Sequence, residues 1–220
     1  MSDFTLYNYY RSSTSYRVRI ALNFKKIPYD YKAVHLLNNG GEQHSPEYRK
    51  INPIGGVPAL VHQGKVISQS RAIIEYLDMI HPEPKLLPSS AYEKALVNQL
   101  CDNINCEIHP LQNLRVMKSL EQKFAATPAQ KDEWIQFWNR EGLSACEKIL
   151  QTTAGRYCLG DQLTMADLFV VPHLFSANRF KVDLSPYPYL LRINEECLKL
   201  EEFQLAHPHR QPDTPAELRA

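Results

Sequence analysis

Residues 4–22 read FTLYNYYRSSTSYRVRIAL, and this stretch sets the fold of the first part of the chain. Its first six residues are rich in aromatic side chains and partly alternate in polarity, which is typical of a β-strand. The polar cluster at 11–15 offers several helix N-caps, and Val18, Ala21 and Leu22 then follow at helical spacing. The stretch therefore predicts a strand, a polar turn and an amphipathic helix.

The residues that follow continue this pattern up to about residue 80. A second strand is expected over 29–36, and two short strands over 58–61 and 65–67 are separated by Gln63-Gly64, which favours a hairpin. A helix over 70–80 carries its apolar residues on one face. Two parallel strands joined by a helix, an antiparallel hairpin and a closing helix make a compact mixed sheet of the α+β class.

The stretch HPEPK at 81–85 interrupts the pattern, because two prolines in three residues give a stiff, extended connector. Strand signals nearly vanish beyond it. Long helices are expected over 91–124, 130–150 and 187–198, and Thr164 with Asp167 forms a capping-box pattern that opens another. We therefore predict an α+β domain over 1–82, a linker over 83–90 and an all-α domain over 91–220.

Composition excludes several classes of protein. The chain has 220 residues, of which 44% are hydrophobic and 22% are charged, as in ordinary globular proteins. A net charge of +1 gives no general drive toward nucleic acid or anionic membranes. No apolar run approaches the ~18 residues of a spanning helix, and we see no signal peptide. We therefore expect a cytoplasmic protein that binds neither nucleic acid nor a membrane.

The cysteines give no sign of a disulfide framework or a metal site. The sequence has 5 of them, an odd number, and none stands in a C-x-x-C motif. This usage suits reduced thiols in a cytosol. No Cys/His cluster has the spacing of zinc ligands, so we expect no bound metal.

The polar turn RSSTS at 11–15 is the first candidate for chemistry. A helix N-terminus carries partial positive charge and free N–H groups, so it can stabilise an anion such as a thiolate. A hydroxyl placed there can donate a hydrogen bond to sulfur. The alternative is that these hydroxyls only cap the helix.

The second and third candidates lie later in the same predicted domain. In GGVPA at 55–59, Pro58 could simply start a strand, whereas a cis Val57–Pro58 bond would turn the Val57 backbone outward to pair with a bound peptide. Gln69 and Ser70 precede or open a helix, where they could hold a carboxylate at its positive end. The alternative is that Ser70 only caps that helix.

Taken together, the three features resemble a thioredoxin-like glutathione-binding domain, and the helical domain after it completes a resemblance to the glutathione transferases. Residues 12–22, SSTSYRVRIAL, resemble the S-S-C-x-x-R-V-R-I-A-L signature of the zeta class, the maleylacetoacetate isomerases. The resemblance covers nearly the whole chain. Further similar stretches are QSRAIIEYL at 69–77, PLQNL at 110–114, GD with TMADL at 160–168, RFKVDL at 179–184 and HRQPDTP at 209–215.

The resemblance implies a set of residues that bind glutathione. Ser12 donates to the glutathione sulfur in this family, and Thr14 replaces the cysteine that most relatives carry, so a protein thiol is not obligatory there. Val57 pairs with the cysteinyl backbone, and Gln69 and Ser70 hold the γ-glutamyl carboxylate. Arg17 and Arg19 lie inside the helix and are expected to be mainly structural or interfacial. The full set implied for glutathione is Ser12, Ser13, Thr14, Ser15, Tyr16, Arg17, Gln43, Val57, Gln69, Ser70, His109, Asn113, Leu114 and Arg115.

The resemblance also implies a reaction and a place for it in phenylalanine and tyrosine catabolism. Glutathione acts as a cofactor in converting maleylacetoacetate to fumarylacetoacetate, and Ser12, Ser13, Arg11 and Arg179 are the candidate catalytic residues. Because the substrate is a small dicarboxylate, arginines such as Arg11 and Arg179 suit it, although Arg11 could equally be a solvated loop residue. His109 stands where many relatives carry glutamine, and it could be an ordinary helix residue beside Pro110. Asp167 is expected to cap a helix.

Three other functions stay open at this point. The same site could serve maleylpyruvate isomerisation, or glutathione transfer and dehalogenation of small α-haloacids. Some proteins with this fold have lost catalysis and only bind, although retention of Ser12, Val57, Gln69 and Ser70 argues against that. A homodimer is implied by the family alone.

Overall fold

The protein, described by a computed structural model over residues 2–219 and for Asn39 by its backbone only, forms two compact units. The first contains residues 2–85 together with 199–219, and the second contains residues 86–198. The first unit is an α+β structure and the second is helical, as the sequence predicts.

A four-stranded sheet with the strand order β2-β1-β3-β4 forms the centre of the first unit. Strand β1 runs parallel to β2, to which it is connected through the helix α1 (Ser13–Phe24), and antiparallel to β3. Leu6 pairs with Tyr31 on one side and with Leu60 on the other, and both leucines are fully buried. The strands are β1 (Phe4–Asn8), β2 (Asp30–Ala33), β3 (Ala59–His62) and β4 (Lys65–Ser68).

The hairpin between β3 and β4 turns at Gln63 and Gly64, as predicted. Both residues have positive φ, at 49° and 72°. That combination matches the right-handed twist of two antiparallel strands joined by a two-residue loop. The turn therefore fixes the register in which Ala59 pairs with Ser68.

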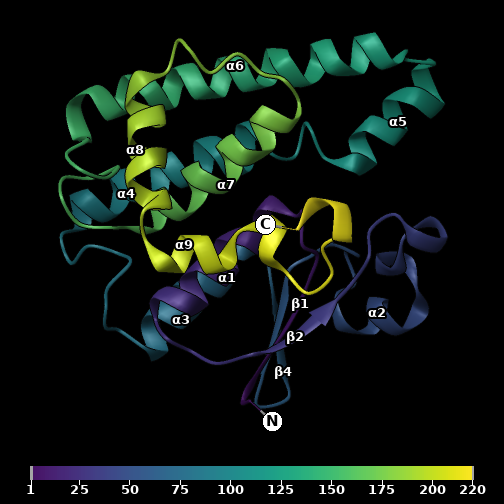
Figure 1. Cartoon of the computed structure of the whole chain (residues 1–220), viewed down its shortest axis with the longest axis horizontal. Coiled ribbons are helices and arrows are strands. Elements are labelled where there is room, and N and C mark those ends of the chain that lie inside the picture. Colours follow the sequence, from purple (N-terminus) through teal and green to yellow (C-terminus); the bar gives the residue numbers. More distant parts are fainter. Residues whose placement is uncertain (1, 220) are drawn as a thin grey trace. The chain divides into compact units, whose positions relative to one another are not determined.

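Two helices, α1 (Ser13–Phe24) and α3 (Ser70–Ile80), contact each other in this unit (Figure 1). Ile73, Ile74 and Leu77 form the buried face of α3, as its periodicity predicts, whereas Ile80, which the same periodicity places with them, is exposed at the end of the helix. A shorter helix, α2 (Pro46–Ile51), was not expected from the sequence. Its signal was present, since Ser45 accepts from the Tyr48 N–H and Pro46 is the first helical residue.

The last residues of the chain join the first unit, which differs from the boundary expected from the sequence. Helix α9 (Glu201–Ala206) lies along α1 (Figure 1). Its carbonyls accept hydrogen bonds from Tyr16 at 3.2 Å, from Arg19 at 3.0 Å and from Asn23 at 3.1 Å. Because α1 supplies these donors, residues 199–219 belong with it and not with the helical unit.

The second unit consists of helices, and its first predicted helix is interrupted. Instead of one helix over 91–124, a π-helical segment follows α4, and α5 begins only at Leu114. Pro110 has no N–H to continue the ladder, and the Asn113 side chain caps the new helix by accepting from Arg115 N–H at 3.2 Å. The elements are α4 (Ala91–Asp102), the π-helix (Asn103–Ile108), α5 (Leu114–Phe124), α6 (Pro128–Thr153), α7 (Met165–Arg179) and α8 (Pro188–Leu198).

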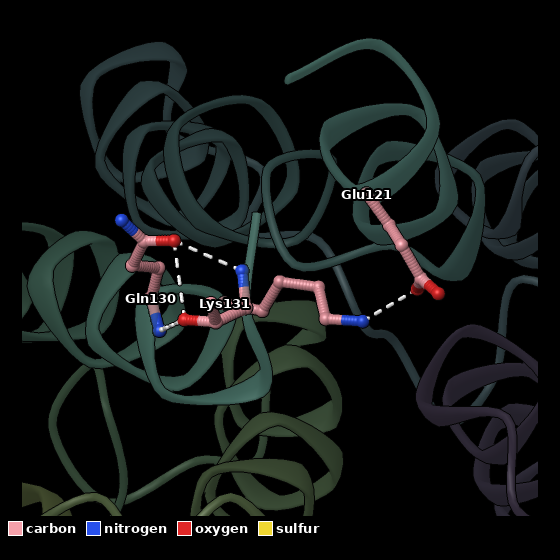
Figure 2. A network of polar contacts seen from close by, with 4 residues as sticks. Glu121, Gln130 and Lys131 are labelled. Carbon is pink, nitrogen blue, oxygen red and sulfur yellow. Dashed lines mark hydrogen bonds and ion pairs between the residues drawn. The ribbon is translucent and has the colours of Figure 1, made fainter. Parts of the chain in front are cut away.

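Polar contacts fix the turn between α5 and α6 (Figure 2). Thr127 and Gln130 form a reciprocal capping box at the start of α6, with the Thr127 N–H donating to Gln130 Oε1 at 2.9 Å. Lys131 Nζ lies 2.6 Å from Glu121 Oε2 on α5. The ion pair lowers the pKa of Glu121, and together these contacts set where α6 begins.

Asp167 is a buried capping residue, as predicted. It accepts from the Thr164 N–H and from the Cys158 N–H, both at 2.8 Å, and closes a capping box at the start of α7. Burial raises the pKa of this carboxyl, and the two N–H donors oppose that effect.

Among residues 2–219, no helix is both long enough and apolar enough to span a bilayer.

The described residues also form short 3-10 segments. They are η1 (Asn38–Gly40), η2 (Glu42–His44), η4 (Pro208–Arg210) and η5 (Ala216–Leu218).

Candidate active site

Ser12 is the N-cap of α1, which confirms the capping alternative, and its donation to a sulfur stays a prediction. Its backbone is extended, with φ −68° and ψ 118°, and its hydroxyl accepts from the Ser15 N–H at 3.2 Å. The Ser12 N–H donates to Tyr9 O at 3.0 Å, which closes the loop after β1. The hydroxyl therefore lies at the positive end of a 12-residue helix while capping it.

Thr14 connects Ser12 to the loop before β3. Its Oγ1 lies 2.9 Å from Ser12 Oγ and donates to Val57 O at 2.9 Å. Ser12 and Thr14 are each half-buried, as is Val57. The hydroxyl proposed to meet a sulfur and the backbone proposed to meet a peptide are therefore only two hydrogen bonds apart.

The Val57–Pro58 peptide bond is cis, as the second alternative for this motif requires, and the pairing of Val57 with a peptide stays a prediction. The preceding carbonyl, Gly56 O, accepts from the Tyr48 hydroxyl at 2.6 Å and from Asn52 Nδ2 at 2.7 Å. Burial raises the pKa of Tyr48 to about 12, so this phenol remains a donor at neutral pH. The loop is thus held in place from the side of α2.

Gln69 and Ser70 lie at the start of α3. Gln69 occupies the N-cap position with φ 75°, a conformation that is costly for a residue other than glycine, and its side chain is exposed and makes no capping hydrogen bond. Ser70 is the first helical residue, so the alternative that it caps α3 is wrong. The Ser70 hydroxyl accepts from Arg17 Nη1 at 3.2 Å, so its own proton can point to a ligand.

Arg17 is a buried structural residue of α1, as expected, and its guanidinium lies next to Ser70. Its side chain is fully buried, and it brings positive charge directly behind Ser70. A helix N-terminus with a buried guanidinium beside it is a favourable environment for a carboxylate. This pair was not visible in the sequence, where the two residues are 53 positions apart.

Gln43 in η2 is buried and presents an acceptor. Its Nε2 donates to Leu36 O at 3.3 Å. Within residues 2–219, its Oε1 is buried and meets no hydrogen-bond donor. A buried acceptor of this kind is costly unless a bound group supplies the donor, which fits a peptide ligand with N–H groups.

Three predicted residues of the α1 start point into the interior of the unit. Ser15 and Tyr16 are fully buried, and the Tyr16 hydroxyl donates to Phe203 O at 3.2 Å. Ser13 is 6% exposed. The side chains of Ser15 and Tyr16 therefore serve the packing of α1 and leave the candidate site to Ser12, Thr14 and the helix backbone.

Arg11 lies in the loop before Ser12 and is half-buried. Its guanidinium carbon is 5.9 Å from the centroid of the Tyr9 ring. Burial raises the pKa of Tyr9 to about 12, and the Arg11 charge opposes that rise. Tyr9 is therefore neutral at neutral pH and is not an anionic partner for Arg11.

Arg19 and Asp213 hold this loop from behind. The fully buried guanidinium of Arg19 donates to Tyr10 O at 2.9 Å and to Tyr9 O at 3.3 Å, which agrees with its predicted structural role. Asp213 accepts from the Tyr10 N–H at 3.0 Å and from the Tyr31 hydroxyl. Asp213 was not predicted to support this loop, because the only signal for it in the sequence is its charge in the family-like tail HRQPDTP at 209–215.

The remaining candidates lie in the second unit, where four of them surround the break between α4 and α5. His109 ends the π-helix and is half-buried, Asn113 caps α5, and Leu114 and Arg115 are exposed. Arg179 is exposed in the last turn of α7, with its guanidinium carbon 4.4 Å from the Phe180 ring centroid. This is a cation–π contact between neighbouring residues at the end of α7.

The described residues hold no group of His, Cys, Asp or Glu side chains placed to bind a metal ion. The described part of the first unit instead offers hydroxyls, a buried amide, the Val57 backbone and the N-termini of α1 and α3. Such a donor set suits a peptide with a sulfur and a carboxylate.

Comparison with known proteins gives full-length similarity. The family model for "Glutathione S-transferase, N-terminal domain" matches residues 6–85, and that for "Glutathione S-transferase, C-terminal domain" matches residues 140–193. A maleylacetoacetate isomerase from Mus musculus is 50% identical over 214 residues, covering 97% of this chain and 96% of the mouse protein.

Two solved structures extend the comparison. The holo structure of a maleylpyruvate isomerase, described as a bacterial glutathione S-transferase in the zeta class, has a TM-score of 0.93 at 41% identity and covers 96% of this chain and 100% of its own. A maleylacetoacetate isomerase from Anaeromyxobacter dehalogenans, with dicarboxyethyl glutathione and citrate bound in the active site, has a TM-score of 0.85 at 39% identity, with coverages of 98% and 100%.

Proposed function

Because the chain belongs to the zeta class of the glutathione S-transferase family, we propose that it is a glutathione-dependent cis–trans isomerase that converts maleylacetoacetate to fumarylacetoacetate. The Anaeromyxobacter relative binds both a dicarboxyethyl derivative of glutathione and a small polycarboxylate. Those two ligands match the cofactor and the substrate class of this proposal.

The observation that carries the proposal is the position of Ser12 at the start of α1, two hydrogen bonds from Val57 O. The backbone N–H and the sulfur of one cysteine residue lie close together. A site for both must therefore place its sulfur donor near its backbone acceptor. Ser12 and Val57 meet that condition.

Glutathione, when bound, supplies a thiolate that adds to the cis double bond, permits rotation about the resulting single bond and then leaves. Ser12 and the α1 N-terminus stabilise that sulfur anion. A free thiol has a pKa near 8.5, and lowering it by about two units requires ~2.7 kcal/mol of preferential stabilisation of the anion. A hydroxyl donor and a helix terminus each supply about 1 kcal/mol or more, which is the right size.

The other residues of the first unit position the tripeptide. Ser70 donates its hydroxyl proton to the γ-glutamyl carboxylate, with Arg17 behind it and Gln69 beside it. Val57 pairs with the cysteinyl backbone, and Gln43 accepts from a further N–H. These contacts hold the sulfur at Ser12, so that binding energy from the ends of the peptide is used to orient its reacting atom.

Arg11 and Arg179 are proposed to bind the substrate carboxylates and the charge that develops on the carbonyl oxygen during addition. His109, Asn113, Leu114 and Arg115 are proposed to contribute from the helical unit. A homodimer and a cytoplasmic location also belong to this proposal. Gel filtration with light scattering tests the dimer.

Maleylpyruvate isomerisation is the second candidate, and the holo zeta-class structure favours it. Both substrates are cis acids with a conjugated carbonyl. The first unit makes the same contacts to glutathione in either case, so it does not distinguish them.

The deciding experiment assays purified protein with maleylacetoacetate and with maleylpyruvate, each with and without glutathione. We expect turnover only with glutathione, and a higher kcat/KM for maleylacetoacetate. Equal turnover without glutathione would remove the proposal. A higher kcat/KM for maleylpyruvate would exchange the two candidates.

A further inference from the structure

The hydroxyls of Ser12 and Thr14 form a chain whose direction follows from counting protons. Val57 O can only accept, so Thr14 must spend its single proton on that carbonyl. Ser12 must then donate its own proton to Thr14 Oγ1, because one proton has to lie in their 2.9 Å contact. The Ser15 N–H donates to Ser12 Oγ from the other side. In this arrangement the Ser12 proton points to Thr14 and the Thr14 proton points to Val57 O, so donation runs in one direction along the chain.

The proposed function requires the opposite direction at Ser12. A sulfur anion needs the Ser12 proton, which the resting chain gives to Thr14. If Ser12 turned its proton to sulfur while Thr14 stayed on Val57 O, two oxygens would face each other at 2.9 Å with no proton between them. That repulsion would offset part of the stabilisation of the anion.

Thr14 can remove this conflict because a hydroxyl is both a donor and an acceptor. If it rotates its proton from Val57 O to Ser12 Oγ, the 2.9 Å contact is satisfied again. Val57 O then accepts from the cysteinyl N–H of the bound peptide. Ser12, which now accepts two hydrogen bonds, becomes a better donor to sulfur, since hydrogen bonds in a chain polarise one another.

Resting on the proposed function, we infer that Thr14 is a positioning residue that reverses the direction of donation in the hydrogen-bond chain of Ser12, Thr14 and Val57. The reversal couples binding of the peptide backbone at Val57 to ionisation of the sulfur at Ser12. Only rotation about two C–O bonds is involved. The thiol proton leaves to solvent, and no proton moves between Ser12 and Thr14. A hydroxyl suits this role because it both donates and accepts a hydrogen bond, and a thiol would do both more weakly.

The test uses Thr14→Val, which keeps the shape and removes the hydroxyl, and Thr14→Ser, which keeps the hydroxyl. The measurement is the pKa of the glutathione thiol bound to the full-length protein, from the ultraviolet absorbance of the thiolate as a function of pH. We expect Thr14→Val to raise this pKa by about 0.7 unit, the equivalent of one ordinary hydrogen bond. Thr14→Ser should leave it within about 0.2 unit of the wild-type value.

S-methylglutathione separates coupling from a structural effect, because its sulfur cannot ionise. We expect its Kd, measured by calorimetry, to change less than about twofold in Thr14→Val. In a Ser12→Ala background, Thr14→Val should add no further shift to the thiol pKa, since the chain no longer reaches sulfur.

Several outcomes would overturn the inference. They are an unchanged thiol pKa in Thr14→Val, an equal rise in Thr14→Ser, an additive shift in the double variant, or a loss of S-methylglutathione affinity as large as the pKa effect. If the wild-type protein binds glutathione and lowers its thiol pKa, and Thr14→Val lowers it equally, this inference fails and the proposed function stands. Wild-type protein that does not bind glutathione removes both.

Discussion

Arg17 Nη1 donates to Ser70 Oγ across 3.2 Å and so joins the first turns of α1 to the first residue of α3. Both side chains are buried, at 0% and 3% exposure. A buried guanidinium is costly to desolvate, and here it lies where an anionic ligand would offset that cost. The pair therefore links the interior of the first unit to its proposed carboxylate site.

Ser70→Ala removes the hydroxyl that would bridge Arg17 and the ligand carboxylate. We expect the Kd for glutathione, measured by calorimetry, to rise roughly tenfold or more, as for loss of a hydrogen bond to a charged group. Ser185→Ala, at an exposed serine of the second unit, is the matched control and should leave the Kd unchanged. An unaltered Kd in Ser70→Ala would exclude this hydroxyl as the carboxylate ligand.

Ser12→Ala removes the donor to sulfur and the side-chain cap of α1. We expect kcat for isomerisation to fall roughly a hundredfold while glutathione still binds, because the lost interaction is one made to the reacting atom. Ser12→Thr keeps both the hydroxyl and the cap and should recover most of the activity. Near-normal turnover in Ser12→Ala would contradict the role assigned to Ser12.

Arg179→Ala tests the proposed grip on the substrate. We expect mainly a rise in KM for the cis acid, about tenfold, because a charged hydrogen bond to a carboxylate is present in both ground and transition states. Arg192→Ala is a close control, since Arg192 is also exposed and also lies over an aromatic ring, 5.9 Å from the Tyr189 centroid. Equal KM values for the two variants would take Arg179 out of the substrate site.

Asp213 stabilises the loop that carries Ser12 by accepting from the Tyr10 N–H and the Tyr31 hydroxyl. We expect Asp213→Ala to lower the free energy of unfolding by about 2–3 kcal/mol, because two donors in a partly buried site lose a charged acceptor. Chemical denaturation measures the change. Glu217→Ala, at an exposed acid in the same terminal segment, should stay within about 0.5 kcal/mol of wild type. A similar small change in Asp213→Ala would show that the loop does not depend on the tail.

His207 makes the first unit sensitive to acid. Burial lowers its pKa to about 4, and the nearby positive charges of His209, Arg210 and Arg19 add to that effect. In the unfolded chain the His207 imidazole has a pKa of 6.5, so it binds a proton more readily there than in the folded protein. The free energy of unfolding therefore decreases as pH falls from 6.5 toward 4. Below about pH 4 the effect of His207 no longer changes with pH.

Unfolding in denaturant at several pH values measures this loss. After allowance for partial exposure we expect about 1–2 kcal/mol from His207. His207→Asn keeps an acceptor for the His209 N–H, which His207 Nδ1 now accepts at 3.2 Å, and should flatten the slope over that pH range. The same slope in wild type and variant would assign the acid sensitivity to other groups.

The local elements of both units could be predicted from the sequence because their causes are local. Residues 4–22 gave the first strand, the turn and α1 through polarity and capping, and Thr164 with Asp167 marked the start of α7. The order of Ser12, Val57 and Ser70 along the chain pointed to one site and one family. The break between α4 and α5 was missed, because helical periodicity continues across residues 103–113 while the backbone changes to a π-helix and a turn.

Only the tertiary structure decided which of these residues meet. Thr14 contacts Val57 across 43 positions, Arg17 contacts Ser70 across 53, and Asp213 contacts Tyr10 across 203. Each of these hydrogen bonds joins groups that no local pattern relates, and its partner exists only once the sheet and α1 have formed. The sequence by itself therefore determined the elements, the N-cap at Ser12 and the class of chemistry, whereas long-range packing determined the direction of the hydroxyl chain and the charge behind Ser70.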